Sequence, residues 1–190
     1  MAAILGKLFA NYRAGENKII YNLPGLANCP ESIKLTSPAF EENGRSPLKH
    51  CGQGVGENIS PILTWTGVPS DAQELVIVME DPDAPIPVPF MHMIAAGINP
   101  QLEQFNEGEL NEDAGSALKL RFGRGTTAKL GYQGPKAMPG HGTHHYIFQL
   151  FALKTKWDPS VSLTRQALSE TLPGLAITRG RLTCTFDRMN

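Results

Sequence analysis

A group of side chains that could bond an anion lies in the stretch GPKAMPGHGTHHYIFQLFAL, residues 134–153. It contains His141, His144, His145 and Tyr146, between a Gly/Pro-rich loop and a nearly unbroken apolar run. If this run is a strand, alternation places His144 and Tyr146 on one face and His145 on the other. A neutral imidazole and a phenol can each donate a hydrogen bond, and charge-assisted bonds to a phosphate oxygen are about twice as strong as neutral ones. The pattern therefore predicts donors at the mouth of a buried strand.

Two carboxylates follow another apolar run, in the stretch LVIVMEDPDAPIP. Asp81 and Asp83 end the run, and Pro82, Pro85 and Pro87 stiffen the backbone after it and remove amide donors. Paired carboxylates can orient an imidazole or act as acid and base. Asp81 would hold the tautomer of an imidazole, or favour its protonation, by bonding its second nitrogen. The alternative is a turn in which both aspartates bond nearby backbone amides.

A fourth histidine, His92, stands in the stretch PFMHMIAAG. Period-two alternation puts Phe90, His92, Ile94 and Ala96 on one face of a strand. A lone histidine among apolar neighbours is either a satisfied core residue or a functional one, and this stretch alone leaves both interpretations open.

The elements that must position these side chains are mostly strands. Apolar stretches bounded by Pro, Gly and Asp predict strands at residues 32–40, 62–69, 74–83, 91–100, 144–153 and 175–186. No segment of helical period lies between residues 62 and 100, which favours antiparallel pairing there. Residues 101–133 are polar and carry several glycines, and they are predicted as long ordered loops with at most short elements.

Helical spacing occurs at the two ends of the chain. Residues 3–13 are predicted as a short amphipathic helix that either packs on the body of the protein or docks on a membrane or a partner. Residues 162–174 are predicted as a second helix, with Ser160 or Ser162 as its N-cap and Pro-Gly as its stop.

Composition limits the classes of function. The chain has 190 residues, which suits one domain over 1–190 with an N-terminal helical extension over 1–22. The formal net charge is −1, so nucleic acid is not expected as the main partner. Three cysteines without close spacing predict neither a disulfide framework nor a zinc site. No signal peptide and no stretch of ~18 apolar residues is found, so we expect a cytoplasmic protein without a transmembrane segment.

Taken together, three motifs resemble those of the phosphatidylethanolamine-binding proteins, in their microbial and fungal Raf-kinase-inhibitor-like branch. They are DPDAP at 81–85, the strand bearing His92, and GYQGP…PGHGTHHYIFQLFAL at 131–153. DPDAP alone is weak evidence, but the three motifs in this order are specific. The resemblance runs from about residue 32 to the end of the chain.

The resemblance implies a mainly β fold, a β-sandwich of two antiparallel sheets with a few peripheral helices. It also implies a small surface pocket for phosphate or another anionic group. By resemblance, the residues of this ligand-binding pocket are Asp81, Asp83, Pro85, His92, Gly134, Pro135, His144 and Tyr146. We expect no cofactor and no metal, because rigid prolines interrupt the carboxylates and histidines and no cysteine joins them.

The chain departs from its relatives at two places. Relatives commonly carry arginine where this chain has His145, so the ion pair made on the face away from the pocket differs. They often carry an asparagine-containing stretch where this chain has GRGTTAKLGYQ, so the altered loop at 124–130 bears on which ligand is bound.

Two functions from different classes remain open. The first is binding of a phosphorylated or carboxylated small molecule, such as a phospholipid headgroup, or of a signalling partner. The second is an enzyme of a natural-product pathway, of the cyclase or isomerase type, with Asp81, His92, His144 and Tyr146 as acid–base candidates. A serine hydrolase is excluded because no G-x-S-x-G turn is present. Many microbial relatives pair, so a homodimer is also an expectation.

Overall fold

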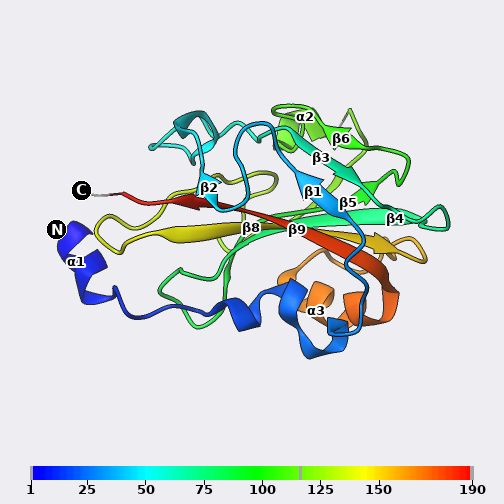
Figure 1. Cartoon of the computed structure of the whole chain (residues 1–190), viewed down its shortest axis with the longest axis horizontal. Coiled ribbons are helices and arrows are strands. Elements are labelled where there is room, and N and C mark those ends of the chain that lie inside the picture. Colours follow the sequence, from blue (N-terminus) through cyan, green and yellow to red (C-terminus); the bar gives the residue numbers. More distant parts are fainter. Residues whose placement is uncertain (1, 116, 189–190) are drawn as a thin grey trace.

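The computed structural model describes residues 2–115 and 117–188, and its strands form two sheets. In the larger sheet the order is β2 (Gly44–Arg45), β9 (Ala176–Phe186), β8 (His144–Leu153), β4 (Glu74–Asp81), β5 (Phe90–Ile98) and β7 (Arg121–Gly123). In the smaller sheet it is β1 (Lys34–Thr36), β3 (Leu63–Thr66) and β6 (Gln104–Phe105). The prediction of a mainly β protein with two sheets and few helices is confirmed (Figure 1). One pairing differs, because β2 runs parallel to β9.

The large sheet is covered on both faces, which explains the unbroken apolar run of β4. Leu75, Ile77 and Met79 enter the core between the two sheets, where they meet Trp65 of the small sheet. The alternate residues of β4 enter a second core on the opposite face, together with Leu168. A strand buried on both faces has no solvent side to carry polar residues.

The second core is closed by α3 (Arg165–Leu175) and by a segment near the N-terminus with three short turns of 3-10 helix, of which the second and third bury side chains in this core. The helix and the turns lie on the same side of the sheet in Figure 1. These turns are η1 (Glu16–Lys18), η2 (Ile20–Asn22) and η3 (Pro24–Leu26). A fourth turn, η4 (Leu48–His50), precedes the loop at 51–58. The described residues of 101–133, all but residue 116, contain only β6, β7 and the four-residue helix α2 (Glu112–Gly115), as the sequence predicted.

The N-cap of α3 differs from the prediction. Thr164 caps the helix, its hydroxyl accepting from the amide of Ala167 at 3.2 Å. Ser160 instead bonds the carboxylate of Asp158, and the carbonyl of Ser162 accepts from the amide of Thr164. The two serines are therefore used in the preceding turn, and the predicted caps were wrong.

Glu80 ties the helical layer to the sheet next to the predicted site. Its side chain is 0% exposed and accepts from the Ile20 amide at 2.7 Å, the Gln149 side chain at 2.9 Å and Arg165 Nε at 2.8 Å. Burial raises the pKa of Glu80, while Arg165 and the other two donors oppose that shift. The network joins η2, β8 and α3 to the end of β4, directly before Asp81.

The N-terminal helix is shorter than predicted and packs differently. α1 spans Ala2–Leu8, and Ile4 and Leu8 are 73% and 75% exposed, so these apolar side chains do not pack on the body. The contact is made through Gly6, where an added Cβ would overlap the Pro139 carbonyl oxygen. The predicted helix over 3–13 is wrong beyond Leu8, because the chain turns there.

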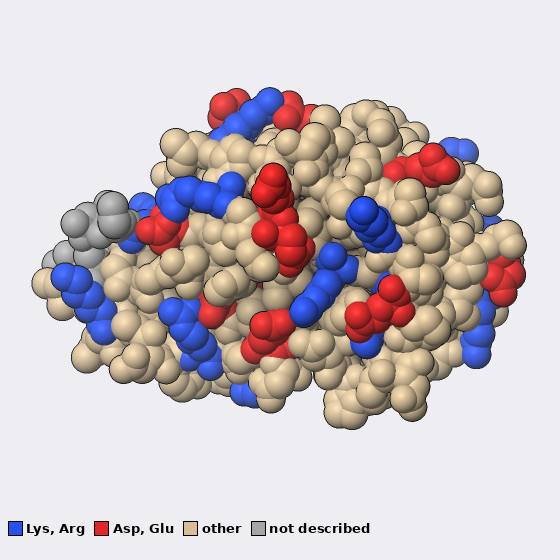
Figure 2. Space-filling model, viewed as in Figure 1, with Lys and Arg blue, Asp and Glu red and all other residues tan. Residues whose placement is uncertain are grey.

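Acidic and basic side chains are interspersed on the face of the molecule seen in Figure 2. No helix within residues 2–115 and 117–188 is long and apolar enough to cross a membrane.

Candidate functional site

The DPDAP motif at 81–85 and the histidine-bearing motif at 131–153 meet where β4 ends and β8 begins. Asp81 is the last residue of β4 and His144 the first of β8. The Nδ1 atom of His144 lies 2.7 Å from Oδ2 of Asp81, and both side chains are buried. The other oxygen of Asp81 accepts from the Asp83 amide at 2.7 Å, so the carboxylate both shapes the turn and orients the imidazole. Both roles that the sequence suggested for Asp81, orienting an imidazole and forming a turn, therefore occur at once.

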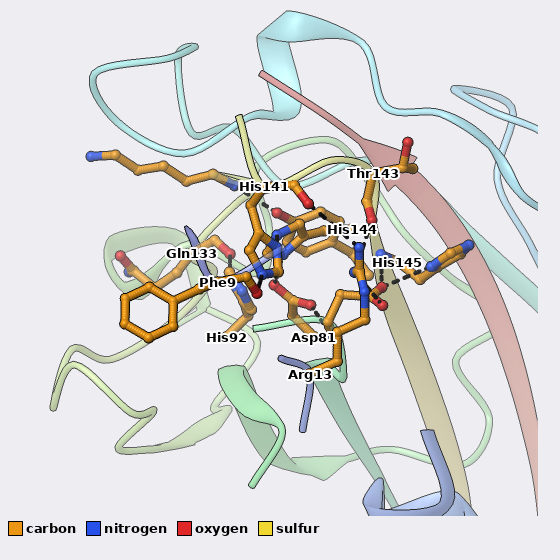
Figure 3. Close-up of polar contacts among 12 residues, drawn as sticks. Phe9, Arg13, Asp81, His92, Gln133, His141, Thr143, His144 and His145 are labelled. Atoms are coloured by element: carbon orange, nitrogen blue, oxygen red, sulfur yellow. Dashed lines mark hydrogen bonds and ion pairs between the residues drawn. The ribbon is translucent and has the colours of Figure 1, made fainter. Parts of the chain in front are cut away.

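His141 extends this pair into a chain of three side chains (Figure 3). Its Nδ1 atom lies 2.8 Å from Nε2 of His144. Its Nε2 atom lies 2.8 Å from the carbonyl oxygen of Phe9 and 3.3 Å from that of Tyr12. The segment after α1 thus covers His141, and both ring nitrogens of His144 are already bonded within the protein.

The hydrogen bonds fix how many protons this chain holds. A carbonyl only accepts, so Nε2 of His141 must carry a hydrogen. One hydrogen must also lie between His141 and His144, and one between His144 and Asp81. An ionised Asp81 with two neutral imidazoles would supply only two hydrogens for these three contacts. The chain therefore holds one additional proton and is neutral overall, which suits its burial.

Asp83 anchors the outer side of the same turn. It accepts from the backbone amide and from Nδ1 of His145, both at 2.7 Å, and pairs with Arg13 at 2.7 Å. Burial would raise the pKa of Asp83, but the bonds from His145 and the charge of Arg13 outweigh it and hold the pKa below its usual value. A guanidinium thus reaches Asp83 from the N-terminal segment, next to His145.

His92 lies on β5 and contacts the same cluster through its ring. Its centroid is 5.1 Å from that of Tyr146 and 4.7 Å from that of Phe90, and its Nδ1 atom lies 2.7 Å from the Gln133 carbonyl oxygen. Burial lowers the pKa of His92, while the charge of Asp81 opposes that shift. Burial also raises the pKa of Tyr146, whose hydroxyl oxygen accepts from the Lys136 amide at 3.1 Å.

A small cavity of about 140 Å³ opens beside His92. It is lined by Gly52, Gln53, Phe90, His92, Thr127, Lys129, Gln133, Gly134 and Lys136. The lining contains two lysines and no carboxylate. The altered loop at 124–130 supplies Thr127 and Lys129, and it is held to β5 by the bond from the Thr126 amide to the Met91 carbonyl at 2.9 Å.

Gly134 forms part of this wall because no side chain fits there. An added Cβ would overlap the carbonyl oxygen of His50 and approach the Gly52 amide nitrogen at 2.8 Å. The Gly52 amide also donates to the Pro135 carbonyl at 2.9 Å, so the loop at 50–52 and the segment at 134–136 run in close contact.

The structure brings together part of the predicted set. Asp81, His144 and Tyr146 join His92 in one buried cluster, but of these only His92 lines the cavity. Asp83 bonds His145 on the far side of the turn, and neither Pro85 nor Pro135 lines the cavity.

Three contributors were not predicted from the sequence: His141, Lys129 and Lys136. His141 was visible as a histidine near the strand but had no assigned role. Lys129 lies in the altered loop at 124–130, and Lys136 lies in the Gly/Pro-rich loop before β8; neither position has a pattern that predicts a binding role. Within the described part of the chain, no cluster of three His, Cys, Asp or Glu side chains is arranged to hold a metal ion.

Comparison with known proteins identifies the family. A model of the family described as phosphatidylethanolamine-binding protein matches residues 36–187. The chain belongs to the phosphatidylethanolamine-binding protein family. A relative, a UPF0098 protein of Pyrococcus abyssi, is 32% identical over 159 residues, covering 83% of this chain and 86% of the relative.

Two further matches bear on fold and role. The crystal structure of YbcL of Escherichia coli, a member of the PEBP family, has a TM-score of 0.76 and 25% identity over 82% of this chain and 98% of that one. The phomoidride biosynthesis cluster protein B of a fungus (Fungal sp. strain ATCC 74256) is 30% identical over 161 residues, covering 82% of this chain and 77% of the relative.

Proposed function

We propose that this PEBP-family protein binds a small molecule through a phosphate or carboxylate group in the His92 cavity. The observation that carries the proposal is the charge of the lining, which has Lys129 and Lys136 and no carboxylate. A volume of about 140 Å³ is well below the roughly 300–1,000 Å³ of pockets that enclose whole drug-sized ligands. It suits an anionic head whose remainder lies outside.

The buried cluster behind His92 gives this site a rigid support. Asp81, His144 and Tyr146 are fixed by hydrogen bonds and ring contacts, and such support holds a binding residue in one orientation. Direct contact of a ligand with Nε2 of His144 would require His141 to leave it. We therefore propose that His144 donates to the anion only when the contact between Nε2 of His144 and Nδ1 of His141 is broken.

The proposal predicts that removing either cavity lysine weakens binding of a simple anion. Lys129→Ala and Lys136→Ala should each reduce affinity for methyl phosphate about fivefold, because a charge-assisted contact at an exposed site contributes about 1 kcal/mol. Isothermal titration calorimetry measures this directly. The matched control is Lys34→Ala on the small sheet, which should leave affinity unchanged. Equal effects from all three substitutions, or no binding of methyl phosphate, would overturn the proposal.

The phosphate could come from a phospholipid headgroup or from a soluble ester. Sedimentation with vesicles that contain phosphatidylethanolamine separates the two sources. Binding to the vesicles that depends on Lys129 and Lys136 favours the headgroup, whereas binding of methyl phosphate alone favours a soluble ligand.

A second candidate is an enzyme that moves a proton on a carboxylated intermediate, of the cyclase or isomerase type. Two features favour it: the resemblance to a phomoidride biosynthesis cluster protein, and the position of His92, whose pKa is lowered by burial, in the cavity wall next to the hydrogen-bonded chain of Asp81, His144 and His141. Turnover of unsaturated carboxylic acids followed by mass spectrometry tests it, and turnover that survives His92→Gln would exclude His92 as the base.

A further inference from the structure

One nitrogen of His92 is committed to the protein. Its Nδ1 atom lies 2.7 Å from the Gln133 carbonyl oxygen, and because a carbonyl only accepts, Nδ1 carries the hydrogen. The segment that holds this carbonyl is itself fixed. Asn58 accepts from the Gly134 amide at 2.8 Å and donates to the Tyr132 carbonyl at 3.0 Å, on either side of Gln133. The tautomer of the neutral ring is therefore set by the fold.

The other nitrogen is left to the cavity. Nε2 of His92 has no hydrogen-bond partner among the described residues. It is also absent from the group of inaccessible side-chain atoms without a partner, so solvent can reach it. Since His92 lines the cavity, Nε2 is the ring nitrogen available to a ligand. In the neutral tautomer with Nδ1–H, this nitrogen is an acceptor.

The charges around the ring favour the neutral form. Burial lowers the pKa of His92, and the proximity of His144 acts in the same direction. The hydrogen bond to the Gln133 carbonyl opposes that shift. Asp81 is the opposing charge, but it is already bonded to His144 within the neutral chain. The adjoining rings of Phe90 and Tyr146 carry no charge, since burial raises the pKa of Tyr146.

We infer that the group facing Nε2 of His92 brings a proton, so that the site takes acids in a protonated form, such as a hydrogen phosphate ester or a carboxylic acid. This inference rests on the proposed function and specifies its ligand class. Lys129 and Lys136 select negative charge, while His92 accepts the hydrogen of an acidic O–H. A fully ionised anion would place an oxygen lone pair against the lone pair of Nε2.

Binding of a protonated acid changes the number of protons bound when the ligand is ionised in solution. A phosphate monoester has a second pKa of about 6, so near pH 8 it is mostly a dianion in solution. On binding, it takes up one proton from the solvent, and that proton lies between a phosphate oxygen and Nε2. Affinity therefore falls as the pH rises above about 6, because the protonated ester becomes scarce.

Methyl phosphate and methyl sulfate form a matched pair of probes. The bound form of methyl phosphate would be a monoanion with one O–H, whereas methyl sulfate is a monoanion of the same shape without a hydrogen to donate. Calorimetry near pH 8, in two buffers of different ionisation enthalpy, should show uptake of about one proton per methyl phosphate. Near pH 6, methyl sulfate should bind at least about tenfold more weakly than methyl phosphate.

His92→Gln tests whether the ring is the acceptor, because its side-chain amide can donate to an anion without taking up a proton. In this variant the proton uptake should approach zero and the preference for phosphate over sulfate should disappear. His145→Gln, at the exposed histidine on the other face of β8, should keep both properties. The two measurements on the unmodified chain do not depend on whether the variant folds.

Each outcome separates the two proposals. Binding of methyl phosphate that depends on the lysines but takes up no proton would overturn this inference and leave the proposed function standing. Proton uptake that persists unchanged in His92→Gln would do the same. Failure of methyl phosphate to bind at all would overturn both.

Discussion

Asp81→Ala is expected to lower the free energy of unfolding by about 3–5 kcal/mol, because it removes the partner of a buried imidazole. The substitution leaves His144 Nδ1 and the Asp83 amide without their acceptor. It also removes the negative charge that balances the additional proton of the chain. Chemical denaturation followed by fluorescence measures the loss.

Asp81→Asn is the matched control and should cost less than about 1 kcal/mol. Its amide can donate to Nδ1 of His144, after which His144 donates to His141 and His141 to the Phe9 carbonyl, so every contact is kept in a neutral chain. If Asn were as destabilising as Ala, the stability of the cluster would depend on an ion pair between Asp81 and a protonated imidazole and not on its hydrogen bonds alone.

The same Asn variant distinguishes binding from catalysis. It preserves the contacts but fixes the hydrogen on residue 81, so a reaction that passes a proton through Asp81 should slow by about 10²–10⁴. A binding protein should keep its affinity for methyl phosphate. The binding function is supported if Asp81→Asn keeps its affinity for methyl phosphate and the unmodified chain does not convert carboxylic acids.

Glu80→Ala is expected to be comparably destabilising, by about 3–5 kcal/mol. The substitution leaves the Ile20 amide and the Gln149 side chain as buried donors without an acceptor, and each unsatisfied donor destabilises the fold by about 1–3 kcal/mol. Arg165 adds less to the loss because it is partly exposed and can bond water. Because Glu80 precedes Asp81, hydrogen exchange should also increase at the end of β4.

A surface ion pair provides the control for Glu80. Glu16 pairs with Arg181 at 2.7 Å, and both side chains are largely exposed, so Glu16→Ala should cost less than about 1 kcal/mol. A loss for Glu80→Ala no larger than that for Glu16→Ala would show that the buried network does not anchor the helical layer.

The strands and the central cluster could be predicted because their signals are local. The unbroken apolar run of β4 reflects burial on both faces, and the alternation along β8 places His144 and Tyr146 on the opposite face from His145. The motifs of the family then connected Asp81 with His144, which are 63 residues apart.

The remainder of the site depends on contacts that a sequence pattern does not encode. His141 has a role only because the carbonyl of Phe9 arrives from more than 130 residues away. Lys129 and Lys136 lie in irregular backbone, where no periodicity indicates which side chains face a cavity. The end of α1 at Leu8, before the predicted residue 13, also depends on distant contacts. Gly6 lies against Pro139, and the Phe9 carbonyl bonds His141.

The proposed function places the anion in the His92 cavity, and a crystal structure determined with methyl phosphate would locate it. We expect a phosphate oxygen within about 3 Å of Nε2 of His92, with the phosphate between Lys129 and Lys136. An empty cavity in crystals that bind methyl phosphate elsewhere, or a phosphate that contacts His144 while Nε2 of His92 remains free, would contradict the account.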